Sequence, residues 1–213
     1  AYFGLLGAEG RFAVEFHHAR GVLLGCVKLG GPGFLANLIL DANGTFRTAL
    51  PDGASRLSAV ESPGAKAESD YVFSGRIVNG TLIGLFENSG VGFSAALEPA
   101  TGPTERYAGY YDAPLLNAAS GSSSWIVSAR GASMVVMRTA ASTTAAWGTV
   151  TTDGVIQMNL SDGQTVTGAL EVTGELVAAQ SDIGNGGSRF AGLKATVART
   201  DRLVNVSSRA IAG

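Results

Sequence analysis

Cysteine, histidine and charged residues are all scarce in this sequence. Its 213 residues include one cysteine, Cys26, and two histidines, and only 15% of the residues are charged. A lone cysteine excludes a disulfide within the chain, and its position in the apolar run 22–27 predicts a small buried hydrophobe. The net charge of −2, with lysines and arginines scattered along the chain, argues against nucleic acid as a partner.

Long apolar runs are also missing. No stretch reaches the roughly 18 apolar residues that a membrane-spanning helix needs, so we expect no membrane span. Aromatic residues, at 8%, are too few for the aromatic girdles of an outer-membrane barrel. The sequence starts at Ala1 with no signal peptide, which fits either a processed mature protein or an excised fragment.

What the sequence does contain is glycine and short alternating segments. Apolar residues alternate with others around Phe12, Phe73 and Trp125, which is the pattern of half-buried strands. Asn-Gly or Asp-Gly pairs separate such segments at 43–44, 79–80, 153–154 and 162–163, where tight hairpin turns need positive φ values. No capped segment has helical periodicity. We therefore predict an all-β protein with minimal helix.

The chain also repeats itself. Residues 11–53 align without a gap on residues 121–163, and the alignment places Phe16 on Ile126 and Leu24 on Met134. We predict an internally duplicated antiparallel body, either barrel-like or a double β-sheet, with a first β repeat at 1–101 and a second at 102–213. The second repeat includes a C-terminal strand segment. The halves either close into one barrel with a pseudo-two-fold axis or form two lobes packed together. The single compact barrel is favoured because closure removes exposed sheet edges.

Few residues are candidates for a catalytic or metal site. Glu15 and His17 share one face of a predicted strand and offer two possible ligands, but zinc needs three or four. His18 falls on the face of Phe12 and is expected in the interior. There is no G-x-S-x-G motif and no suggestive spacing of carboxylates. We expect no metal, no cofactor and no enzymatic activity.

Two other groups of residues are candidates for binding. Tyr110, Tyr111 and Trp125 would stack against a sugar or peptide if exposed, although such aromatics more often belong to a core. The segment 41–45 resembles the start of a calcium loop. Its last carboxylate ligand is missing, and its alignment with 151–155 favours a hairpin turn.

The second half ends in the run Leu203-Val204-Asn205-Val206-Ser207-Ser208-Arg209. With the segment that begins at Tyr107, this run resembles β-rich repeat modules of large secreted multi-domain bacterial surface proteins of the Verrucomicrobia type. The resemblance implies export and a multi-domain parent, and it carries no catalytic residues. The segment 71–76 has a weaker similarity to ligand-binding barrels of the streptavidin and lipocalin type.

These observations predict a non-enzymatic structural, adhesion or fibre-forming module that is secreted or displayed at the cell surface. Its partners would be further copies of itself or other surface proteins. Residues Leu203, Val204 and Val206 are the predicted assembly strand, because alternating residues of this kind can pair with an exposed sheet edge. The alternative is a barrel that binds a small apolar or carbohydrate ligand in an interior lined around Phe12 and Trp125.

Overall fold

The computed structural model describes residues 1–27, 33–50, 71–114, 121–139, 143–160, 165–173, 176–183 and 194–199. In these ranges the chain is built from antiparallel strands, with only two short 3-10 helices. The predicted all-β fold with minimal helix is therefore confirmed. No described helix has the length and apolar character that crossing a membrane requires.

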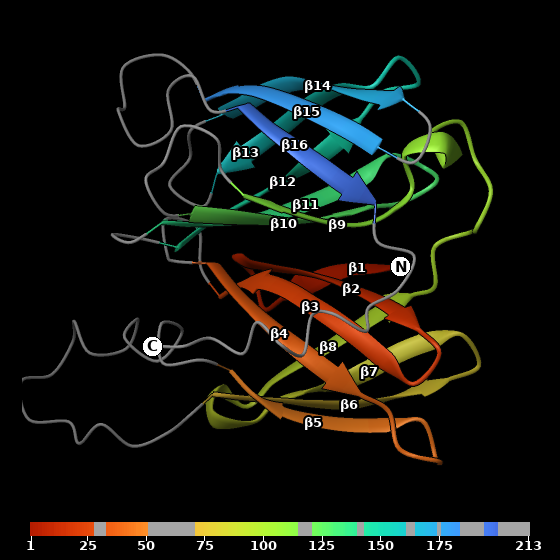
Figure 1. Ribbon diagram of the computed structural model, residues 1–213. Coiled ribbons are helices and arrows are strands. Elements are labelled where there is room, and N and C mark those ends of the chain that lie inside the picture. Colours follow the sequence, from red (N-terminus) through yellow and green to blue (C-terminus); the bar gives the residue numbers. More distant parts are fainter. Residues whose placement is uncertain are drawn as a thin grey trace, which may run out of the picture.

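The described strands divide into two sets of eight. Figure 1 shows the two sets one above the other. The first set is β1 (Tyr2–Leu6), β2 (Gly10–His17), β3 (Arg20–Cys26), β4 (Gly33–Ile39), β5 (Thr45–Ala49), β6 (Val72–Val78), β7 (Thr81–Phe86) and β8 (Val91–Ala96). The second set is β9 (Gly109–Pro114), β10 (Gly121–Val127), β11 (Ala132–Thr139), β12 (Thr143–Val150), β13 (Val155–Leu160), β14 (Thr165–Thr173), β15 (Leu176–Ile183) and β16 (Lys194–Arg199). The 3-10 helices are η1 (Glu87–Ser89) and η2 (Glu105–Tyr107).

The first half consists of two four-stranded sheets, β1-β2-β3-β4 and β5-β6-β7-β8. The sheets approach each other at both sides: an isolated bridge joins Tyr2 to Leu97, and β4 lies beside β5. No ladder among the described residues joins β4 to β5. A hydrogen bond from Thr48 Oγ1 to the Asn37 carbonyl, at 3.0 Å, connects them instead. These two strands are therefore sheet edges.

The second half is one antiparallel sheet with the order β10-β11-β12-β13-β14-β15-β16-β9. Two residue pairs between β16 and β9, Ala198 with Asp112 and Arg199 with Tyr111, bring the last strand back to the first. The sheet thus curls into a barrel-like body that closes over a short seam. The two halves form separate sheets, so the favoured single barrel closed from both halves does not occur, and the chain forms two packed β bodies instead.

The Asn-Gly and Asp-Gly turns predicted from the sequence have the expected positive φ values where the structure describes them. Asn79 and Gly80 both have positive φ, 50° and 74°, and form the two-residue turn between β6 and β7. Gly44 and Gly154 also adopt positive φ in the turns that start β5 and β13. The turn predicted at 162–163 lies outside the described residues.

Strand pairing corrects the alignment of the two halves. Val14 pairs with Leu23 in the first half, and Val127 pairs with Ser133 in the second. When Leu23 is matched with Ser133, as the sequence alignment requires, Val14 corresponds to Val127 and not to Ser124. The ungapped alignment is therefore wrong by three residues over β2 and β10. The β2–β3 hairpin continues for three more residue pairs, whereas β10 and β11 end in a loop organised by hydrogen bonds to Ser128.

The corrected alignment changes which residues share a face. Phe16 packs against the core of the first half, whereas Ile126 lies between the halves, so the predicted match of these two residues is wrong. The counterpart of Ile126 is Ala13, which lies in the same cluster between the halves. The division of the chain at 101 and 102 remains a prediction, although the sheets do change between β8 and β9.

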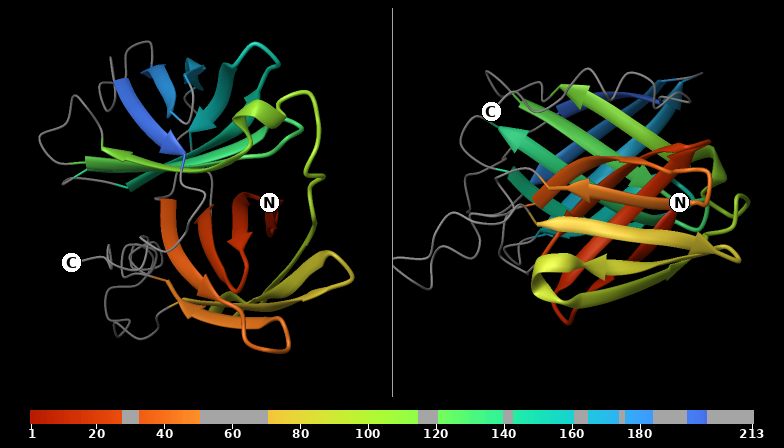
Figure 2. Two further views of the ribbon diagram at one scale, coloured as in Figure 1. Left: turned by 45° about the vertical axis from the view of Figure 1, so that its right-hand side comes forward. Right: turned by 90° about the horizontal axis from the view of Figure 1, so that it is seen from below.

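The two halves pack face to face through a buried apolar cluster, here called the junction. It consists of Ala13, Val22, Leu24, Cys26, Tyr110, Ile126, Met134, Val136 and Ala145. Strands β2, β3 and β4 lie against β10, β11 and β12, their own counterparts (Figure 2). A Cβ atom on Gly33 would lie 2.9 Å from that of Ala145, its equivalent by strand pairing. Two halves related by a two-fold axis would meet in this way.

The junction explains the apolar run in β3. Every residue from Gly21 to Cys26 is buried, because one face of the strand looks into the first half and the other into the junction. Leu23 belongs to the core of the first half and Leu24 to the junction. Strands covered on both faces lose their alternating pattern and become continuously apolar.

Candidate functional site

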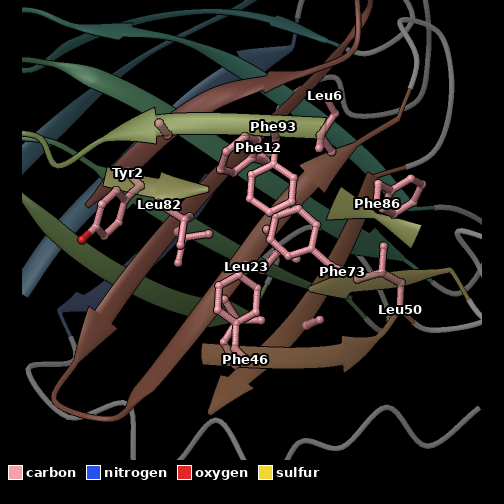
Figure 3. Close-up of a cluster of buried hydrophobic side chains, with 14 of the residues drawn as sticks. Tyr2, Leu6, Phe12, Leu23, Phe46, Leu50, Phe73, Leu82, Phe86 and Phe93 are labelled. Carbon is pink, nitrogen blue, oxygen red and sulfur yellow. The ribbon is translucent and has the colours of Figure 1, made fainter. Parts of the chain in front are cut away.

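The interior of the first half is filled by aromatic side chains (Figure 3). Phe73 stacks on Phe93 with ring centroids 4.2 Å apart, and Phe12 meets Phe93 edge to face at 5.1 Å. Phe46 stacks on the other side of Phe73 at 5.7 Å. The part of the ligand cavity that was predicted around Phe12 is therefore occupied by the protein's own core.

The histidines and Glu15 do not form a site together. His17 and His18 are both exposed, with ring centroids 4.5 Å apart at the β2–β3 turn. The predicted interior position of His18 is wrong, because this residue has a positive φ of 55° and belongs to the turn. Glu15 forms an ion pair with the N-terminal ammonium group of Ala1 at 3.2 Å. Among the described residues, no three His, Cys, Asp or Glu side chains converge as metal ligands would.

The segment that resembles a calcium loop is a hairpin turn, as its alignment predicted. The Asp41 carboxylate accepts hydrogen bonds from the backbone N–H groups of Asn43 and Thr45, at 2.8 and 2.9 Å. The hydroxyl of Thr45 donates to the other carboxylate oxygen. These hydrogen bonds lower the pKa of Asp41 and hold both of its carboxylate oxygens within the turn.

The aromatic candidates of the second half are buried. Tyr110 lies in the junction, and its hydroxyl is 3.4 Å from Ser124 Oγ. The Tyr111 hydroxyl donates to the carbonyl of Tyr107 at 2.7 Å. Trp125 is buried as well, so these three residues do not form an exposed stacking surface.

A small pocket of about 280 Å³ opens at the rim of the junction. Phe3, Leu5, Arg11 and Trp147 line it, and the Arg11 guanidinium lies over the Trp147 ring, 5.7 Å from its centroid. In this cation–π contact the Arg11 guanidinium and the half-buried Trp147 ring interact with each other. Nothing in the sequence links these residues, because they come from three strands in two halves of the chain.

A wider groove of about 710 Å³ crosses the sheet of β6, β7 and β8. Gly75, Gly84 and Gly92 lie along it, while Ile83 and Leu85 supply apolar surface. Gly75 pairs directly with Gly84, and the bare side of this pair faces the core, where the rings of Phe46 and Phe93 cover it. The groove is open to solvent. Strands β6, β7 and β8 belong to the sheet of the first half that lies farther from the second half (Figure 1). Such a surface suits a broad contact with another macromolecule better than the enclosure of a small substrate.

Cys26 is a buried free thiol in the junction, as the sequence predicted. Burial raises its pKa to about 11, because the thiolate would lose its hydration there. The equivalent position in the second half is Val136, in line with a packing role for this side chain.

The thiol of Cys26 is therefore expected to be almost inert in the folded protein. At pH 8 a thiol with this pKa carries about 100-fold less thiolate than an unperturbed one, so Ellman's reagent should react at least about 100-fold more slowly before unfolding than after. The rate should rise as the pH approaches 11, where the thiolate forms. Absorbance at each pH measures the reaction, and equal rates in buffer and in urea would show that the junction does not protect Cys26.

Comparisons with known proteins do not assign this chain to a family. No protein family and no curated protein matches the chain. Among solved structures, the chain aligns with a crystal structure of a DnaN sliding clamp (DNA polymerase III subunit beta) from Pseudomonas aeruginosa bound to griselimycin, with 9% identity and a TM-score of 0.16. The alignment covers 93% of this chain and 56% of the clamp chain, so this chain spans a little over half of that protein. A TM-score this low carries no argument about fold or function.

Proposed function

We propose that this protein is a non-enzymatic structural or adhesion module, secreted or displayed at the cell surface. The observation that supports this proposal most is the junction, where buried apolar side chains from two β bodies pack against each other. A structural module needs such packing between its parts, whereas an enzyme needs converging polar groups. The open groove over β6, β7 and β8 offers a further contact surface for other surface proteins.

Strand addition between copies is the proposed mode of assembly. The receiving edge is formed by β4 and β5, which lie side by side without a ladder between them in the part of the chain that the structure describes. The incoming strand is the segment 203–211 of a second copy, with Leu203, Val204 and Val206 as its apolar side chains. That segment lies outside the described residues and enters the proposal through its alternating sequence alone.

The test is the size of the native particle. The full chain should form assemblies well above the 21.6 kDa monomer, measured by light scattering and viewed by negative-stain microscopy. Removing residues 202–213 should reduce these assemblies to monomers, because the incoming strand is lost. The double variant Val204→Lys and Val206→Lys should do the same, since two charges on one face oppose its burial.

A control variant separates this mechanism from a general loss of solubility. Val155→Lys changes an exposed side chain at the start of β13, outside both the receiving edge and the incoming strand, and should leave the particle size unchanged. A full chain that is monomeric at every concentration would overturn the assembly proposal. Assemblies of unchanged size after deletion of 202–213 would overturn the role of the terminal strand.

A further inference from the structure

The small pocket at the rim of the junction holds one cation among apolar and aromatic side chains. Its volume is about 280 Å³, and Phe3, Leu5 and Met134 supply apolar surface to its walls. Among the described residues that line the pocket, Arg11 alone is charged. Pockets between two packed bodies of one protein are frequent sites of small-molecule binding. This pocket therefore combines the usual location of a ligand site with a single group that can select the ligand.

Side chains from both halves point into the pocket. Arg11 lies two residues before Ala13 on β2, and Trp147 lies two residues after Ala145 on β12. Ala13 and Ala145 both belong to the junction, so the side chains of Arg11 and Trp147 extend into the space between the halves. Phe3, on β1, packs against the same cluster. The pocket is therefore formed only where the two halves meet.

The Arg11 guanidinium has hydrogen-bonding capacity to spare. One of its terminal nitrogens donates to the Gly10 carbonyl at 2.9 Å, and the group lies over the Trp147 ring. A guanidinium carries five N–H donors, so a single carbonyl leaves most of them open to a further acceptor. In the part of the chain that the structure describes, no carboxylate forms an ion pair with Arg11. A half-buried cation without a counter-ion favours an anion as the ligand of this pocket.

The packing of the two halves does not require this pair of residues. Strand pairing makes Ser124 the equivalent of Arg11, and Leu35 the equivalent of Trp147. Leu35 packs against the junction as Trp147 does. The equivalent strands therefore meet at the other rim without a guanidinium or an indole. Joining the halves does not account for the cation and the indole ring at the first rim.

We propose that this pocket binds a small monocarboxylate with an aromatic body. The planar fork of Arg11 presents parallel N–H groups that match a carboxylate in a bidentate contact. The aromatic body packs against Phe3, Leu5 and Met134. The volume of the pocket lies at the lower end of the range for ligand sites, so the body is about one ring in size. This inference goes beyond the structural role and does not depend on it.

The indole signals in 15N–1H NMR spectra of the full chain report on this pocket. The chain has two tryptophans, and the variant Trp147→Phe identifies the signal of Trp147 by its loss. Phenylacetate is the probe, and phenylacetamide, which has a similar shape without the charge, is its matched control. Phenylacetate should shift the Trp147 signal saturably and leave the signal of the buried Trp125 in place. Phenylacetamide should bind at least about tenfold more weakly, because it cannot form an ion pair with Arg11.

Substitutions of arginine test the role of the charge. Arg11→Gln should weaken phenylacetate binding at least about tenfold and change phenylacetamide binding by less than about twofold. Arg11→Lys keeps the charge but loses the planar fork, so its affinity should lie between those of the unchanged protein and Arg11→Gln. Arg130→Gln, at an exposed arginine outside the pocket, is the matched control and should leave the affinity unchanged.

Three results would contradict the proposal. The first is the absence of a saturable shift of the Trp147 signal with phenylacetate, and the second is equal binding of phenylacetate and phenylacetamide. The third is phenylacetate binding that persists unchanged in Arg11→Gln. Circular dichroism shows whether Arg11→Gln is folded. The comparison of the two probes on the unchanged protein tests the proposal even if that variant does not fold.

Discussion

Replacing Phe73 by alanine is expected to lower the free energy of unfolding by about 3–5 kcal/mol. Phe73 is fully buried, and its ring contacts those of Phe12, Phe46 and Phe93. Removing it leaves a cavity that three stacked rings cannot close, and it removes the aromatic contacts as well. Urea unfolding followed by circular dichroism measures the change.

The matched control is Phe16→Ala, at the edge of the same cluster. Phe16 is only partly buried, so its removal exposes existing surface and leaves no closed cavity. We expect a cost of roughly 1–2 kcal/mol. Equal costs for the two variants would mean that the aromatic cluster is not the main support of the first half.

Replacing Leu24 by lysine should separate the two halves. Leu24 is fully buried in the junction, where a lysine would bury an ammonium group among apolar side chains. We expect a loss of about 3–5 kcal/mol of stability, because the ammonium group would lose its hydration among the apolar side chains of the junction. The expected signature is local: Cys26, in the same cluster, should react rapidly with Ellman's reagent although the protein remains all-β by circular dichroism.

Hydrogen exchange measures whether the first half stays folded in the Leu24→Lys variant. Amides of β6 and β7 should stay protected in the Leu24→Lys variant, because their side chains pack in the separate aromatic core. Leu5→Lys is the control, since Leu5 is 53% exposed and its replacement should leave Cys26 protected. Loss of protection in both halves at once would show that the junction and the core unfold as one unit.

Local features of the fold could be predicted from the sequence because each has a local physical cause. The Asn79-Gly80 turn follows from its need for positive φ, and the strands follow from alternating residues. The length of the β2–β3 hairpin could not be predicted, since sequence does not show where pairing ends. An alignment error of three residues followed, and it moved Ile126 to the wrong face.

The candidate sites depended on distant packing and were predicted less well. His17 and His18 were noted as unusual, yet a tight turn placed both in solvent. Trp125 was noted as an aromatic, but its burial follows only from the packing of β10 between β9 and β11. The groove over β6, β7 and β8 could not be predicted, because its lining residues come together only in the strand register.

The covalent link between the halves gives them a freedom that a symmetric dimer lacks. In a homodimer every substitution appears in both subunits, so a change that empties one core empties the other. Here Phe34 in one half and Ala146, its equivalent by strand pairing in the other, can change independently. One half can therefore acquire substitutions that its counterpart does not share. Duplication within one chain permits such a division of labour.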